Sequence, residues 1–210
     1  GGLAAAIRLL AAGHHVTVVE RREQIGGRAY QLRDAGDTWD MGPSLITMPW
    51  LLDELYGLAG TRTADQVTLR PLDPFYRILW SDDARAFDFV GDRDRMVGEI
   101  AKFSAGDATR YDAFMAASRR IHEEGILVAG RQAFTDPVTF AKLFPTMVRL
   151  DALRSLRGFV GRYFTDPRVR MVFDFHSLFI GGDPRRVPAI SPPLAYLQVG
   201  DGVGYAGGGV

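Results

Sequence analysis

The chain has 210 residues, of which 47% are hydrophobic and none is cysteine, and its 25 Lys and Arg balance its 25 Asp and Glu. This composition predicts a packed core, excludes disulfides, thiol catalysis and cysteine-ligated metals, and gives no positive field that would favour nucleic acid. The four histidines have no metal-ligand spacing, so no metal site is expected, and no apolar run reaches the about 18 residues of a membrane-spanning helix.

The first 20 residues predict part of a nucleotide-binding unit. The alanine-rich segment from Leu3 to Ala12 predicts a helix that ends at Gly13, and the β-branched run at 16–19 predicts a buried parallel strand. A glycine turn, a helix and a strand form the second half of a βαβ dinucleotide-binding motif. We therefore expect the first strand of the motif to be missing, so that the chain is a fragment of a longer protein.

Five residues in this region have the chemistry of a dinucleotide site. Gly2 fits the third glycine of G-x-G-x-x-G, and Glu20 follows 18 residues later, where a carboxylate accepts hydrogen bonds from ribose hydroxyls. Gly26 and Gly27 allow a close approach to a diphosphate, for which Arg28 supplies a cationic fork. This loop favours FAD over a nicotinamide cofactor. The alternatives are a solvated strand-end acid and an ordinary glycine turn.

The rest of the chain divides into a loop-rich part, a β-rich part and a helical part that begins near residue 92. Acid–proline pairs predict helix starts at Asp136-Pro137 and Asp166-Pro167, and Pro145 is expected to break or kink the first of these helices. The tail from 200 to 210 is glycine-rich and ends with no capping element. The remaining predicted elements are a helix at 49–58 and strands at 67–72, 75–80 and 86–90, with Asp82-Asp83 in a hairpin turn.

Residues 1–47 resemble the start of the phytoene desaturase family, the bacterial and fungal carotenoid desaturases among the amine-oxidase-like FAD flavoproteins. The segments PLDPFYRILW at 71–80 and FDFHSLFIGGDP at 173–184 extend the resemblance. Relatives continue well beyond the length of this chain, so a C-terminal half that completes the flavin site is expected to be missing too. We expect the piece alone to be inactive.

The resemblance implies an α/β fold with a partial, doubly wound, Rossmann-like FAD-binding domain at 1–60. A mixed-sheet substrate domain is expected at 61–91 and 186–210, and a helical subdomain at 92–185. Carried over by position, the five residues named above hold the ADP half of FAD. Asp40, Gly42 and Pro43 bring a loop close to the isoalloxazine ring, with a plain turn as the alternative. No catalytic residue is identified.

The activity that the resemblance implies is desaturation of phytoene, with hydride transfer from a C40 polyene to flavin and a quinone or oxygen as the electron acceptor. Three alternatives stay open. One is a related activity on C30 diapophytoene or a hydroxylated carotenoid. The second is an amine or porphyrinogen oxidase, which the two later segments disfavour. The third is a non-enzymatic prenyl-lipid-binding relative, which the flavin contacts disfavour.

The segment 137–164 carries five cations and one acid, Asp151, with aromatic residues between them. This pattern suits anionic lipid head groups, so we expect a cytoplasmic protein that docks peripherally on a membrane. The alternative is a solvated helix face over a phenylalanine-rich core. His176 is expected to line a polyene tunnel, to assist proton loss, or to be a hydrogen-bonded core residue. The members of the basic segment are Lys142, Arg149, Arg154, Arg157 and Arg162, with Phe140, Phe144, Phe159, Tyr163 and Phe164.

Overall fold

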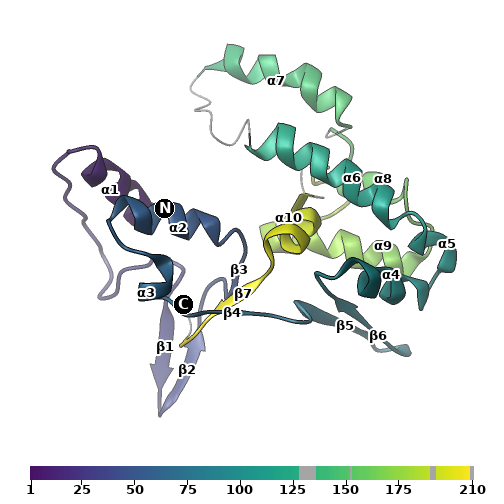
Figure 1. Ribbon diagram of the computed structural model, residues 1–210, viewed down its shortest axis with the longest axis horizontal. Helices are drawn as coiled ribbons and strands as arrows, with labels where there is room; N and C mark the ends of the chain where they lie inside the picture. Colours follow the sequence, from purple (N-terminus) through teal and green to yellow (C-terminus); the bar gives the residue numbers. More distant parts are fainter. Residues whose placement is uncertain (128–135, 152, 190–192, 209–210) are drawn as a thin grey trace. The chain divides into compact units, whose positions relative to one another are not determined.

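The computed structural model describes all residues except 128–135, 152, 190–192 and 209–210. The described chain forms two compact units, one of residues 1–72 with 201–210 and one of residues 73–200. Both units combine helices and strands, which confirms the expected α/β class at that level (Figure 1). The assignment of FAD-binding, substrate and helical domains to particular ranges stays a prediction.

The first unit holds three helices and two small antiparallel sheets among its described residues. The sheets are the hairpin β1–β2 and a three-stranded sheet in the order β3-β7-β4. The elements are α1 (Gly2–Ala11), β1 (Gln31–Asp34), β2 (Asp37–Asp40), β3 (Leu45–Ile46), α2 (Trp50–Leu58), α3 (Thr63–Gln66), β4 (Leu69–Pro71) and β7 (Gly204–Ala206).

Helix α1 confirms the helix that was predicted at the start of the chain. Gly13, with φ of 86°, ends it in the left-handed conformation that glycine adopts without strain. The N–H of Gly13 bonds the carbonyl of Leu10 at 2.9 Å, and the N–H of His14 bonds that of Leu9 at 3.0 Å. These two bonds satisfy carbonyls that the helix end would leave unpaired.

The prediction of a buried parallel strand at 16–19 is wrong for this structure. These residues form no strand, and Val19 is 89% exposed. A parallel strand is stable only when neighbours on the sheet take up its N–H and C=O groups, and no described strand pairs with this run. Every strand pairing in the described residues is antiparallel, so the doubly wound sheet stays a prediction.

The glycine-rich tail forms strand β7, although its composition gives no local strand signal. Tyr205 lies opposite Leu45 on one side and opposite Arg70 on the other, so β7 is the central strand of its sheet. Glycine disfavours an isolated strand, but pairing on both sides offsets that cost.

The second unit consists of one β-hairpin and a set of helices. Helix α4 packs against β6, and α8 packs against α9 (Figure 1). The elements are β5 (Tyr76–Trp80), β6 (Asp83–Phe89), α4 (Arg93–Ala101), α5 (Ala105–Ala108), α6 (Tyr111–Ile121), the π-helix η1 (His122–Leu127), α7 (Pro137–Arg149), α8 (Leu156–Val160), α9 (Pro167–Asp174), the 3₁₀ helix η2 (Phe175–Ile180) and α10 (Pro193–Asp201), whose last residue belongs to the first unit.

Several predictions for this unit are confirmed. The hairpin turns between Trp80 and Asp83, which lie opposite each other. Asp166 caps α9 by accepting from the N–H groups of Arg168 at 2.8 Å and Val169 at 3.1 Å. The break predicted at Pro145 is wrong, because α7 continues through this residue to Arg149.

Aromatic rings fill the core of the second unit. Phe114 and Phe173 are buried with ring centroids 4.8 Å apart, and Phe164 stacks on Phe173 at 4.6 Å. Phe89 of the hairpin meets Phe173 edge-on at 6.0 Å. These contacts join the hairpin to α6 and α9 through apolar burial, which stabilises each large side chain by about 1.5–3 kcal/mol.

Candidate functional site

In the first unit, Arg22 links Glu20 to the diglycine loop. Its N–H donates to Glu20 Oε1 at 2.9 Å, and its Nη1 donates to the carbonyl of Gly27 at 3.0 Å. Its guanidinium also lies 5.4 Å from the ring centre of Tyr30. The structure therefore brings the predicted ribose ligand and the predicted diphosphate loop together. Sequence reasoning missed Arg22, since nothing in its spacing marks it as a bridge.

Gly42 brings the second predicted loop against the first. The N–H of Met41 bonds the carbonyl of Tyr30 at 2.9 Å, and a Cβ at Gly42 would lie 2.1 Å from the carbonyl oxygen of Arg28. No side chain fits that separation, so glycine is required here for close approach of two backbones. Pro43 follows on the surface. The 26–28 and 40–43 loops therefore form one continuous structure.

The diglycine loop presents unused hydrogen-bond donors. Within the described residues, the N–H groups of Gly26, Gly27 and Arg28 make no hydrogen bond, and the Arg28 guanidinium has no partner. Gly26 has φ of 117°, and a Cβ there would lie 2.4 Å from the carbonyl oxygen of Ala29. Free N–H groups on a glycine turn beside an arginine fork fit the oxygens of a diphosphate. The residues present thus fit the diphosphate of FAD.

Asp40 is held in place by two donors. Its carboxylate accepts from Gln31 Nε2 and from the Tyr205 hydroxyl, each at 3.1 Å, and this bond raises the pKa of Tyr205. Gly2 is less constrained, because no atom of the described chain lies within 4 Å of a Cβ built there. The close helix–strand packing expected of Gly2 is not formed in this structure, and its cofactor role stays a prediction.

In the second unit, the two later segments of the family resemblance meet around a buried histidine. His176 has no exposed surface, and its Nε2 lies 3.1 Å from the Tyr76 hydroxyl and 3.2 Å from Gln198 Oε1. Its Nδ1 lies 3.2 Å from the carbonyl of Phe173. Burial lowers the pKa of His176 to about 4, so the ring is neutral at pH 7. These contacts favour the hydrogen-bonded core interpretation.

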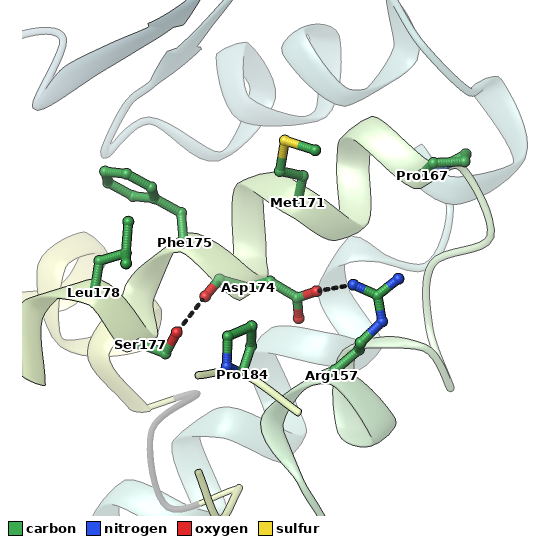
Figure 2. A pocket seen from close by; sticks show the side chains of 8 residues that line it. All are labelled: Arg157, Pro167, Met171, Asp174, Phe175, Ser177, Leu178 and Pro184. Carbon is green, nitrogen blue, oxygen red and sulfur yellow. Dashed lines mark hydrogen bonds and ion pairs between the residues drawn. The ribbon is translucent and has the colours of Figure 1, made fainter. Parts of the chain in front are cut away.

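A second feature of this unit is an apolar cavity of about 410 Å³ with one acid in its wall (Figure 2). Met171, Phe175 and Leu178 contribute to its apolar lining. Arg157 Nη1 lies 3.6 Å from Asp174 Oδ2, whereas Asp174 Oδ1 is buried without a hydrogen-bond partner among the described residues. Burial raises the pKa of Asp174 to about 6, against the opposing effect of Arg157. The cavity therefore holds a carboxyl group that titrates near neutrality.

Comparison with known proteins gives the family. The model of the family described as flavin containing amine oxidoreductase matches residues 1–209. Relatives named phytoene desaturase (lycopene-forming) come from Paracoccus sp., at 37% identity over 209 residues, and from Pantoea ananas, at 38% over 209 residues. A phytoene desaturase (neurosporene-forming) from Cereibacter sphaeroides is 36% identical over 210 residues.

These matches cover 100% of the chain but only 42%, 42% and 40% of the three relatives. They confirm the resemblance that the sequence motifs indicated, and a flavin-containing family supports FAD as the cofactor. No described helix has the length and apolar character needed to cross a membrane. The chain belongs to the flavin-containing amine oxidoreductase family.

Proposed function

We propose that this chain is part of an FAD-dependent carotenoid desaturase that acts on phytoene. The observation that carries the proposal is the 37–38% identity, over the whole chain, to relatives named phytoene desaturase. The joined loops at 26–28 and 40–43 support it, because their free donors suit a flavin diphosphate. The names of the relatives record two different products, lycopene and neurosporene.

The roles of the chain's residues follow from their positions. Flavin supplies the hydride acceptor when it is bound, and a proton must leave the neighbouring carbon of the polyene. Glu20 accepts from the ribose hydroxyls, and Arg28 with the N–H groups of Gly26 and Gly27 binds the diphosphate. Gly2 begins the helix beside it. Asp40, Gly42 and Pro43 would bring a loop close to the isoalloxazine ring. A quinone or oxygen takes the electrons in this proposal.

Expression of the full-length reading frame in phytoene-accumulating cells tests the proposal. A coloured polyene is expected, and its absorption bands give the number of new double bonds. Unchanged phytoene with soluble, flavin-loaded protein would contradict the substrate and favour a C30 or hydroxylated carotenoid, an amine or a porphyrinogen. Soluble protein without flavin would favour the prenyl-lipid-binding alternative.

We also infer that helix α7 docks a cytoplasmic protein on a membrane surface. Val138, Phe144 and Val148 are each more than half exposed, with exposed Ala141 and Pro145 between them on the same side. Such a face suits the boundary between head groups and acyl chains. The side chain of Phe140 lies outside the described residues.

The cations of the basic segment support this docking less than their number indicates. Four of its arginines pair with acids: Arg149 with Glu124, Arg154 and Arg162 with Asp151, and Arg157 with Asp174. The apolar face is therefore the better target for mutation.

Liposome flotation tests docking through α7. The double variant Phe144→Ser with Val148→Ser is expected to reduce binding at least tenfold. The control is Val19→Ser, which changes an exposed apolar residue of the first unit. Equal binding of all three proteins would contradict docking through α7.

A further inference from the structure

A polar cavity of about 320 Å³ lies where α7 ends, beside α6, η1 and α8. Its apolar lining includes Phe159 and Ala117, which are buried. Its polar lining comes from three arginines, two acids and one tyrosine. These are Arg120, Arg149, Arg162, Glu124, Asp151 and Tyr163.

Guanidinium groups outnumber carboxylates around this cavity. Glu124 pairs with Arg149, and a single oxygen of Asp151, Oδ2, accepts from both Arg154 Nε at 2.8 Å and Arg162 Nη1 at 2.7 Å. Although burial opposes it, these two bonds hold the pKa of Asp151 below its ordinary value, so the acid is ionised at pH 7.

Two donors at the cavity have no partner in the described part of the chain. Arg120 makes neither a hydrogen bond nor an ion pair there, and the Tyr163 hydroxyl makes no hydrogen bond. The Tyr163 ring is fixed by packing on Phe114 at 5.7 Å and on Phe159 at 5.4 Å between centroids. The three lining arginines and two lining acids leave an excess of one positive charge. Arg154, which bonds Asp151 but does not line the cavity, adds a second positive charge beside it.

We propose that this cavity binds the phosphomonoester head group of a membrane lipid. A phosphomonoester carries a charge of about −1.5 to −2 near neutral pH and has three acceptor oxygens, which match the charge excess and the free donors of Arg120 and Tyr163. Arginine forks bind such oxygens in pairs. A phosphodiester has one charge fewer and fewer free oxygens, so it fits the cavity less well.

The position of the cavity on the helix favours a lipid over a soluble phosphate. Arg149, in the last turn of α7, lines the cavity, and the exposed face of Val138, Phe144 and Val148 belongs to the same helix. A lipid can place its head group in the cavity while the apolar face enters the membrane. This inference rests on the membrane-docking part of the proposed function, and it adds the identity of the head group.

Vesicle binding of the flavin-loaded, full-length protein tests the inference. Phosphatidylcholine vesicles are doped with phosphatidic acid or with phosphatidylserine and matched in surface potential. We expect at least tenfold tighter binding to phosphatidic acid. Arg120→Gln is expected to reduce this preference to twofold or less, and Tyr163→Phe to reduce it about threefold. The matched control, Arg119→Gln, removes a neighbouring charge that pairs with Glu123 outside the cavity and should leave the preference unchanged.

The outcomes separate the head-group inference from membrane docking. Equal binding of the wild-type protein to both anionic vesicles would overturn the head-group inference and leave docking intact. Binding to no vesicle at all would contradict docking itself. Calorimetry with inorganic phosphate is the second arm. Tight phosphate binding that depends on Arg120, without a preference between the vesicles, would assign the cavity to a soluble phosphate and overturn the lipid.

Discussion

Asp107 is a buried carboxylate that receives hydrogen bonds from the segment before helix α9. Its oxygens accept from the N–H of Thr165 at 2.9 Å, from the hydroxyl of the same residue at 2.9 Å and from the N–H of Asp166 at 2.8 Å. Asp107→Ala leaves these donors unsatisfied in the interior. We expect the free energy of unfolding, measured in urea, to fall by about 2–4 kcal/mol.

Asp82 supplies the control for this prediction. Its side chain is 74% exposed and pairs with Arg168 at 3.2 Å, so Asp82→Ala should change the free energy of unfolding by less than about 1 kcal/mol. Equal losses in the two variants would show that Asp107 acts as a surface charge and not as a buried acceptor.

The close approach of two backbones at Gly42 predicts that a side chain there weakens FAD binding. Gly42→Ala places a methyl group against the carbonyl of Arg28 and forces the 26–28 and 40–43 loops apart. We expect FAD to bind flavin-free protein at least tenfold more weakly, as measured by flavin fluorescence. The control is Gly57→Ala in α2, where the added Cβ meets open space and alanine favours the helix by up to about 1 kcal/mol. Unchanged FAD affinity in Gly42→Ala would contradict the joined-loop site.

Between elements, the contact of α8 with α9 predicts a dependence of stability on pH. Burial raises the pKa of Asp174 from 3.8 to about 6, and its side chain is 7% exposed. Between pH 4 and 6 the unfolded chain therefore loses this proton before the folded chain does, and the free energy of unfolding falls as pH rises. The loss is complete above pH 7 and amounts to about 3 kcal/mol.

Comparison with Asp174→Asn isolates this group, because other titrating groups cancel in the difference. The difference in the free energy of unfolding, wild type minus variant, is expected to fall by up to about 3 kcal/mol between pH 4 and pH 8. It is measured by urea unfolding at each pH. Arg157→Gln should make the total fall larger and extend it to higher pH, since Arg157 opposes the rise in the pKa of Asp174. A difference that stays flat, or that rises with pH, would contradict the buried, partnerless Oδ1.

Elements with strong local signals could be predicted from the sequence. The helix ended by Gly13, the capped start of α9 and the β5–β6 hairpin each follow from side-chain and turn chemistry within a few residues. The strand predicted at 16–19 does not form, and the position of strand β7 in the tail was not predicted, because each depends on partners far away in the sequence. Tyr205 pairs with residues near 45 and 70, which no local pattern of glycines reveals.

In the candidate sites too, residues marked by a local pattern could be identified from the sequence, whereas residues that depend on the folded chain could not. Glycine spacing and charge identified Glu20, Gly26, Gly27 and Arg28, because phosphate chemistry demands those residue types in a short loop. Arg22, Asp174 and Arg120 could not be found in this way. Their roles depend on what surrounds them in the folded chain: a carbonyl across a loop, an apolar wall and an excess of guanidiniums.

At the scale of the whole chain, the division into two units predicts two independent unfolding events. The first unit draws on both ends of the chain, and β7 joins them by pairing with β3 and β4. Tyr205→Pro removes a backbone donor from the central strand of this sheet and clashes with its pairing. Hydrogen exchange should then lose protection at 45–46 and 69–71, while 76–80 and 83–89 of the second unit keep theirs.

Tyr205→Phe distinguishes the contribution of the strand pairing from that of the Tyr205 hydroxyl in this experiment. It removes only the bond to Asp40, so the β3-β7-β4 pairing should stay protected while Asp40 loses one donor. If Tyr205→Pro also released protection at 76–89, the two units would unfold as one cooperative structure, and β7 would stabilise the second unit as well as the first. Retained protection in the second unit means instead that its aromatic core is sufficient for its own stability, because the buried rings of Phe89, Phe114 and Phe173 contact one another within that unit.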